Sequence, residues 1–209
     1  LIIIGPFSLL LTRYAADRFF DGCRHRIFGS FLFALAFIMP IAGCCGVVLF
    51  STGGGDLPDL QESSAIALLL LACGIFTAGS YLTSVLCYRW VLGSFVVGFV
   101  ASCGLVILAV QNYGADAALA GFAAGHALLF LLLFWRLARE FGGDYDVSHD
   151  ILFYVRRYPE LMWAGLFYNC GLWVDKILFW QFSAQSFSIS GWIKASPEYD
   201  LSIHIALAT

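Results

Sequence analysis

The sequence has 209 residues, of which 61% are hydrophobic and only 12% charged, and its mean hydropathy is +0.86. Soluble domains are about half apolar and about a quarter charged, so this composition excludes an ordinary soluble domain and indicates an integral membrane protein. The formal net charge of −3 gives no support to nucleic-acid binding, because the few basic residues form short clusters and no continuous stripe.

Both ends of the sequence are apolar. Leu1–Leu11 is an apolar run from the first residue, and residues 203–209 (IHIALAT) resemble the start of another one. We therefore expect an internal fragment of a longer membrane protein, truncated at both ends. The lack of a signal peptide consequently carries no information.

Several runs are long and apolar enough to cross a bilayer, which takes roughly 20 residues for about 30 Å of hydrocarbon. Residues 1–12 are the tail of one span, and the complete runs are residues 28–50, 64–87, 90–110, 118–135 and 161–182. Residues 183–209 are expected to form an outer loop and the start of the next segment. The sequence thus predicts a single all-α integral membrane domain, a polytopic transmembrane helix bundle over residues 1–209.

Basic residues alternate between the expected loops. The arginines fall in the first, third and fifth loops: Arg13, Arg18, Arg24, Arg26; Arg89; Arg136, Arg139, Arg156 and Arg157. The second and fourth loops, residues 51–63 and 111–117, contain no base. Because basic loops stay in the cytoplasm, the pattern predicts that the odd loops lie inside and that residues 183–200 lie outside.

The stretch before the last full run, residues 149–158 (HDILFYVRRY), mixes apolar residues with two arginines. It is consistent with an amphipathic segment on the inner membrane surface and equally with a solvated loop. We expect the following helix to begin near Pro159, since proline needs no N–H there and Glu160 meets the positive end of the helix dipole.

Residues 118–135 contain two further features. Gly121 and Gly125 form a G-x-x-x-G pattern that lets helices approach closely, although this spacing is also frequent by chance in glycine-rich spans. His126 lies in mid-span, where it could relay protons or hydrogen-bond to a neighbouring helix. The sequence leaves both alternatives open.

Asp175 and Lys176 are adjacent charges inside the apolar run 161–182. The apolar residues of this run favour insertion by only ~4 kcal/mol, whereas the two charges oppose it by ~6 kcal/mol. Asp175 lies roughly 21 Å along the span, too deep to reach the inner interface. The charges should therefore face partner helices or a polar cavity, which makes them candidates for a substrate or ion pathway.

Helical geometry spreads polar and aromatic side chains over one broad face of this run. Adjacent residues are about 100° apart, so we expect Asp175 and Lys176 not to face each other and each to have another partner. Two neighbouring stripes result, one of Asn169, Trp173, Lys176 and Trp180, the other of Tyr168, Leu172 and Asp175. Such a face can bind a sugar ring or a cation, although a buried ion pair that only fixes helix packing is the alternative.

Three segments resemble a known family. Residues 156–180 (RRYPELMWAGLFYNCGLWVDKILFW) resemble the signature region of PelG-type exporters of Pel exopolysaccharide, and residues 12–20 (TRYAADRFF) and 191–203 (GWIKASPEYDLSI) resemble its flanking segments. The resemblance implies a multi-pass bacterial inner-membrane protein of the multidrug/oligosaccharidyl-lipid/polysaccharide flippase (MATE-like) superfamily, with more helices than these. It also implies an amino-sugar-rich polymer as substrate, and other Pel inner-membrane proteins and a cytoplasmic glycosyltransferase as partners. It assigns no role to individual residues.

We therefore expect a transporter that works by alternating access around a polar cavity, and not an enzyme. The residues expected along the pathway are Asp175, Lys176, Asn169, Tyr168, Trp173, Trp180 and His126. Metal-ligand clusters, catalytic triads and phosphate-binding loops are missing from the sequence, so no cofactor is expected.

Two alternatives remain. A membrane glycosyltransferase component is suggested by the acids of residues 144–146 (DYD), which could hold a divalent metal, but the loop between Arg136 and Pro159 is too short for a nucleotide-binding domain. A non-transporting scaffold of a secretion complex is the other.

Overall fold

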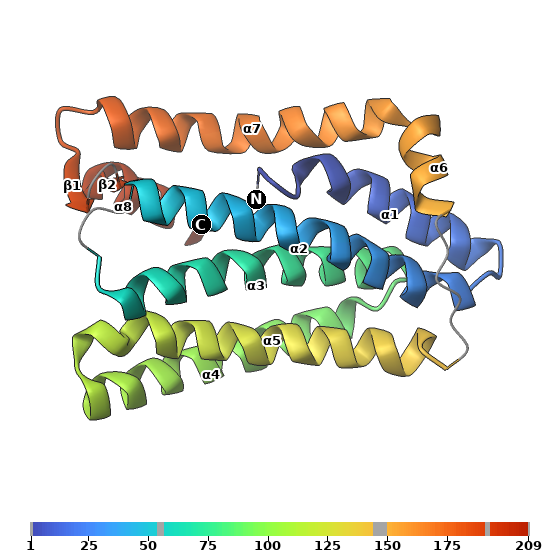
Figure 1. Ribbon diagram of the computed structural model, residues 1–209, viewed down its shortest axis with the longest axis horizontal. Helices are drawn as coiled ribbons and strands as arrows, with labels where there is room; N and C mark the ends of the chain where they lie inside the picture. Colours follow the sequence, from blue (N-terminus) through green and yellow to red (C-terminus); the bar gives the residue numbers. More distant parts are fainter. Residues whose placement is uncertain (1, 54–56, 144–149, 191–192, 209) are drawn as a thin grey trace.

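In the computed structural model, the chain forms a bundle of long helices that run roughly parallel to one another (Figure 1). The structure describes residues 2–53, 57–143, 150–190 and 193–208. In chain order the elements are α1 (Gly5–Phe20), α2 (His25–Gly53), α3 (Asp59–Ser84), α4 (Tyr88–Tyr113), the 3-10 helix η1 (Ala115–Ala117), α5 (Ala118–Phe141), α6 (Asp150–Arg157), α7 (Pro159–Phe182), β1 (Phe187–Ser190), β2 (Ile193–Ala195) and α8 (Pro197–Ala208).

Four helical segments of the described chain are long and apolar enough to cross a membrane. They are His25–Phe50, Asp59–Ser84, Tyr88–Tyr113 and Ala115–Phe141. The prediction of an all-α polytopic membrane protein is therefore confirmed. The α7 helix is not one of the four, because Asn169, Asp175 and Lys176 lower its hydropathy. That α7 also spans the membrane stays a prediction.

Helix α1 is longer than expected. The sequence predicted that the first span would end near residue 12, whereas α1 continues to Phe20. Arg13 and Asp17 extend it, since their side chains lie one turn apart and their Nε and Oδ2 atoms are 3.0 Å apart. The helix ends before Gly22, whose φ of +76° suits glycine. The expected first loop is thus too long, because polar residues can continue a helix where its apolar run stops.

Most of the arginines that we assigned to loops also lie on helices. Arg24 lies in the turn between α1 and α2, whereas the others lie on helices: Arg13, Arg18, Arg26, Arg89, Arg136, Arg139, Arg156 and Arg157. Their common position is at one end of the bundle, which we call the arginine-rich end. It is the end where α1 meets α2, α3 meets α4, and α5 leads to α6.

The long helices form three layers. Figure 1 shows α7 with α1 on one side of the molecule and α4 with α5 on the opposite side, with α2 and α3 between them. The core between the layers is aromatic and aliphatic, and includes the fully buried Tyr14, Phe31, Tyr81, Leu129, Leu133 and Leu137. The candidate pathway side chains on α7 are therefore remote from His126 on α5.

Gly121 and Gly125 face α4 at very close range. A Cβ atom on Gly121 would lie 2.7 Å from the carbonyl oxygen of Leu105, and one on Gly125 would collide with the backbone of Ser102. The G-x-x-x-G pattern therefore does mark a helix contact here. Between membrane helices such fit matters, because lipid is as apolar as the side chains and burial alone gives little driving force.

We expect Gly125→Ala to destabilise the full-length protein by about 1–3 kcal/mol, the usual cost of overpacking a tight contact. The measurement is the midpoint of thermal unfolding in detergent. Gly104→Ala is the matched control, since a Cβ atom added to Gly104 on α4 would meet nothing within 4 Å. Equal midpoints for the two variants would contradict the role assigned to Gly125.

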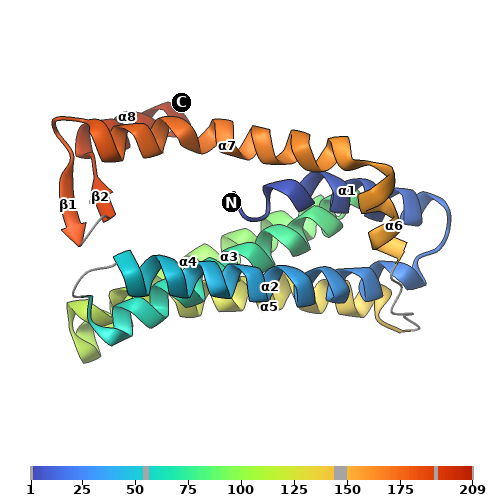
Figure 2. The same cartoon turned by 45° about the horizontal axis from the view of Figure 1, so that its top comes forward.

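The segments before and after α7 are more structured than the sequence alone could establish. Figure 2 shows α6 running across the end of the bundle, as a helix and not a loop. Beyond α7, residues 183–200 include an antiparallel hairpin in which Phe187 of β1 pairs with Ala195 of β2, followed by the start of α8. We had expected a loop there. The hairpin returns the chain so that α8 lies against the end of α7.

Candidate functional site

The first half of α7 crosses α1 at two glycines. A Cβ on Gly165 would collide with the carbonyl oxygen of Gly5, and one on Gly5 would lie 3.0 Å from the Cβ of Asn169. The Asn169 side-chain amide donates to the Gly165 carbonyl oxygen at 2.9 Å. Asn169 is thus fixed at the α1–α7 crossing, whereas Tyr168 beside it is 66% exposed.

Asp175 is held by α8. The Tyr199 hydroxyl donates to Asp175 Oδ2 at 2.5 Å, and the Asp175 side chain remains 53% exposed. The Lys176 ammonium donates to the Leu172 carbonyl oxygen at 2.9 Å, but it also lies 3.8 Å from Asp175 Oδ1. Each charge therefore has another partner, as we expected, but our expectation that the two charges would not face each other was wrong. Flexible side chains bridge the 100° between their Cα positions.

Two tryptophans flank Lys176 on the same stripe of α7. The Lys176 Nζ atom lies 5.7 Å from the centre of the Trp173 ring, and the Trp173 and Trp180 rings meet edge to face at 6.4 Å. The Trp180 Nε1–H donates to Asp200 Oδ1 at 3.0 Å. The stripe of Trp173, Lys176 and Trp180 is therefore present as a contiguous surface.

We call the group formed by Trp173, Asp175, Lys176, Trp180, Tyr199 and Asp200 the α7–α8 cluster. Tyr199 also stacks on Phe179 at 4.2 Å, which seats α8 on α7. Two carboxylates, an ammonium group and three polar aromatic rings can bind a hydroxylated or cationic ring by stacking, hydrogen bonds and charge.

Sequence reasoning missed Tyr199 and Asp200. Both lie in the first turn of α8, directly after Pro197, within the stretch that we expected to be a loop. The signal that could have found them is the proline followed by acids, a typical helix start. What could not be read is that this helix folds back on α7.

His126 belongs to another part of the molecule. Its Nδ1 atom lies 3.3 Å from Ser102 Oγ on α4 and 3.0 Å from the carbonyl oxygen of Phe122, and its ring packs 5.7 Å from that of Phe99. This is the geometry of a helix–helix hydrogen bond. Because α5 and α7 lie on opposite sides of the bundle (Figure 1), His126 is not part of the α7–α8 cluster.

Comparison with known proteins identifies the family. A family model described as "PelG: Putative exopolysaccharide Exporter (EPS-E)" matches residues 1–209, the whole chain. The chain belongs to the PelG family. The resemblance of residues 12–20, 156–180 and 191–203 to PelG-type proteins is thereby confirmed. Searches of the curated proteins and of the solved structures found no match.

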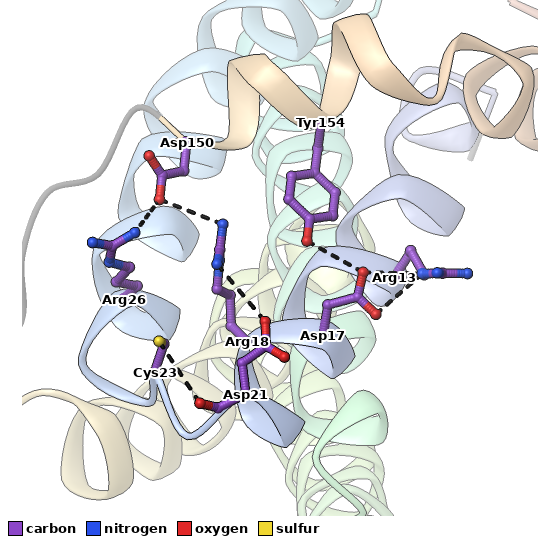
Figure 3. Close-up of polar contacts among 8 residues, drawn as sticks. All are labelled: Arg13, Asp17, Arg18, Asp21, Cys23, Arg26, Asp150 and Tyr154. Atoms are coloured by element: carbon purple, nitrogen blue, oxygen red, sulfur yellow. Dashed lines mark hydrogen bonds and ion pairs between the residues drawn. The ribbon is translucent and has the colours of Figure 1, made fainter.

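This PelG-family protein has a second polar group, at its arginine-rich end (Figure 3). Asp150, the first residue of α6, accepts from Arg26 at 2.5 Å and lies 3.5 Å from Arg18. One turn on, the Tyr154 hydroxyl donates to Asp17 Oδ2 at 3.2 Å. We call these residues the α6 clamp, because they tie α6 to α1 and to the start of α2.

Aromatic rings enclose part of the α6 clamp. The rings of Tyr14 and Tyr154 meet edge to face at 5.0 Å, and the Arg18 guanidinium lies 5.2 Å and 5.5 Å from their centres. Burial, together with the negative charge of Asp17, raises the pKa of the Tyr154 hydroxyl, so Tyr154 remains a hydrogen-bond donor. The clamp joins residues that are more than 120 positions apart, and no local pattern predicted it.

The acids of residues 144–146, on which the glycosyltransferase alternative depends, lie outside the described residues. The family's description names an exporter and not an enzyme.

Proposed function

We propose that this PelG-family protein is a multi-pass transporter subunit of the bacterial inner membrane that exports an amino-sugar-rich exopolysaccharide to the periplasm. The observation that carries the proposal is the match of the exporter family to the whole chain. The four membrane-length helices support it, since a polymer exporter must build its path through the bilayer.

In this proposal the helices form a flippase-like bundle that alternates between inward-open and outward-open states, with the α7–α8 cluster along the polymer path. The Asp175 carboxylate is half-exposed and is bound by the Tyr199 hydroxyl and by a weak contact to Lys176. An ammonium group of an amino sugar can replace the hydroxyl, and the Trp173 and Trp180 rings can stack on the sugar. Because Tyr199 belongs to α8, this exchange would favour one state over the other.

The partners in this proposal are the lipid bilayer, the polysaccharide, other Pel inner-membrane proteins and a cytoplasmic glycosyltransferase that makes the polymer. The arginine-rich end faces the cytoplasm, following the positive-inside rule. It is the side from which a nascent polymer would enter.

The decisive experiment uses inverted membrane vesicles, whose cytoplasmic face points outward. We expect vesicles that contain the full-length protein and the glycosyltransferase to convert added nucleotide sugar into polymer protected from an added glycoside hydrolase. Vesicles without the protein should make only unprotected polymer.

Two other results would each overturn the proposal. Polymer synthesis by the full-length protein without the glycosyltransferase would identify an enzyme. Polymer that is made but stays fully accessible to the hydrolase, although the complex assembles, would identify a scaffold.

A further inference from the structure

The wall of the bundle contains an apolar cavity of about 190 Å³ near α6. Its lining comes from α1, α2, α6 and α7, and includes Leu11, Ala34, Phe37, Leu152 and Met162. Every residue of the lining has an apolar side chain. A cavity of about 150 Å³ already holds a benzene molecule, so this one accommodates a segment of hydrocarbon.

The cavity opens on the outer surface of the bundle. Phe37 and Leu152 are 52% and 49% exposed, whereas Leu11 and Ala34 at the back of the cavity are buried. Leu11 and Ala34 lie about 14 Å from the arginine-rich ends of their helices, at ~1.5 Å per residue. That depth is within one leaflet of a bilayer with about 30 Å of hydrocarbon. The natural neighbour of the opening is therefore a lipid acyl chain.

Helix α6 places positive charge next to this opening. Arg156 is one turn after Leu152 on the same face of α6, and Arg157 is one turn after the exposed Phe153. Arg157 lies over the Phe153 and Tyr158 rings. Neither arginine has a carboxylate partner among the residues that the structure describes.

The orientation of α6 suits a membrane surface. The helix runs across the arginine-rich end of the bundle, roughly perpendicular to the long helices (Figures 1 and 2). Apolar Leu152 and Phe153 and cationic Arg156 and Arg157 are thus presented together in the plane of the interface, the arrangement of an interfacial amphipathic helix. The α6 clamp holds the helix in this position.

We propose that this site binds an anionic phospholipid, with one acyl chain in the α1–α2–α6–α7 cavity and the head-group phosphate on Arg156 and Arg157. The charge of the arginines selects for an anionic lipid over a zwitterionic one. The arginines alone would attract any anionic lipid surface without specificity. The cavity makes this a specific site, because binding there requires an acyl chain inserted between the helices.

The test is native mass spectrometry of the full-length protein, titrated with phosphatidylglycerol and with phosphatidylcholine of the same acyl chains. We expect the wild type to retain phosphatidylglycerol at least about fivefold better, and Arg156→Gln to lower that retention about fivefold. Arg139→Gln is the matched control, since Arg139 also lies near the arginine-rich end but away from the cavity, over Trp135. Its retention should equal that of the wild type.

A second measurement needs no variant. Phosphatidylglycerol with a photoreactive group in mid-chain should label the wild-type protein at Phe37, Leu152 or Met162. Equal retention of the two lipids, equal losses for Arg156→Gln and Arg139→Gln, or labels confined to other helices would each overturn the proposal. A cavity covered by another protein segment would leave Phe37, Leu152 and Met162 unlabelled, which also overturns it.

Discussion

Asp175→Asn in the full-length protein is expected to reduce polymer export at least about tenfold, because one charge-assisted hydrogen bond contributes ~1.5–3 kcal/mol. The substitution keeps the size of the side chain and its contact with the Tyr199 hydroxyl, but it removes the charge that would bind an ammonium group. Lys176→Ala should also impair export, since it removes the ammonium between Asp175 and Trp173. The measurement is secreted polymer in cells that lack the wild-type protein.

The matched control is Glu160→Gln, which removes a carboxylate from the same helix in its first turn, far from the α7–α8 cluster. It should leave export unchanged. Tyr199→Phe removes the hydroxyl that binds Asp175 without changing any charge, and a smaller loss is expected. If Asp175→Asn and Lys176→Ala, both expressed at the wild-type level, leave secretion intact, the pathway role of the cluster is excluded.

Asp150→Asn is expected to loosen α6. It weakens the ion pairs that join α6 to α1 and α2, and Arg18, whose side chain is only 17% exposed, loses a partner. Asp150 and Arg26 are each more than a third exposed, so water screens their pair and we expect a loss near ~1 kcal/mol. That loss corresponds to about fivefold faster amide hydrogen exchange in residues 150–157, if α6 opens as a local unit.

Hydrogen exchange of the full-length protein measures this effect. Glu140→Gln is the control, because Glu140 pairs with Arg136 inside α5 and joins no two helices. Exchange in residues 150–157 that is the same in Asp150→Asn, Glu140→Gln and the wild type would show that the α6 clamp does not hold the helix.

The class of the protein and the approximate positions of its long helices could be predicted from the sequence. Apolar runs near 28–50 and 90–110 lie within α2 and α4, because hydrocarbon thickness sets the length of a spanning helix. The runs predicted the ends less well. Helix α1 extends to Phe20 because the Arg13–Asp17 pair continues it beyond the apolar run. The length of an apolar run cannot predict such a polar extension.

Only part of the candidate site could be predicted from the sequence. The stripe of Trp173, Lys176 and Trp180 follows from the helical repeat, which is a local property. The partners Tyr199 and Asp200 do not, because they depend on the hairpin that returns α8 to α7. His126 was grouped with the α7 residues because all of them are polar side chains inside apolar runs, but the layers of the bundle separate them.

The sequence by itself determined a membrane-embedded helical chain of the PelG type, since composition, run length and the idiosyncratic residues 156–180 are all local in the chain. Tertiary structure alone decided which residues meet: Asp150 with Arg26 and Asp175 with Tyr199 through polar contacts, and Gly125 with Ser102 through close packing. The physical reason is that lipid and protein interior are equally apolar. The hydropathy of a helix therefore determines whether it inserts into the membrane but not which helices it packs against. Helix pairing depends on close steric fit and on a few polar contacts.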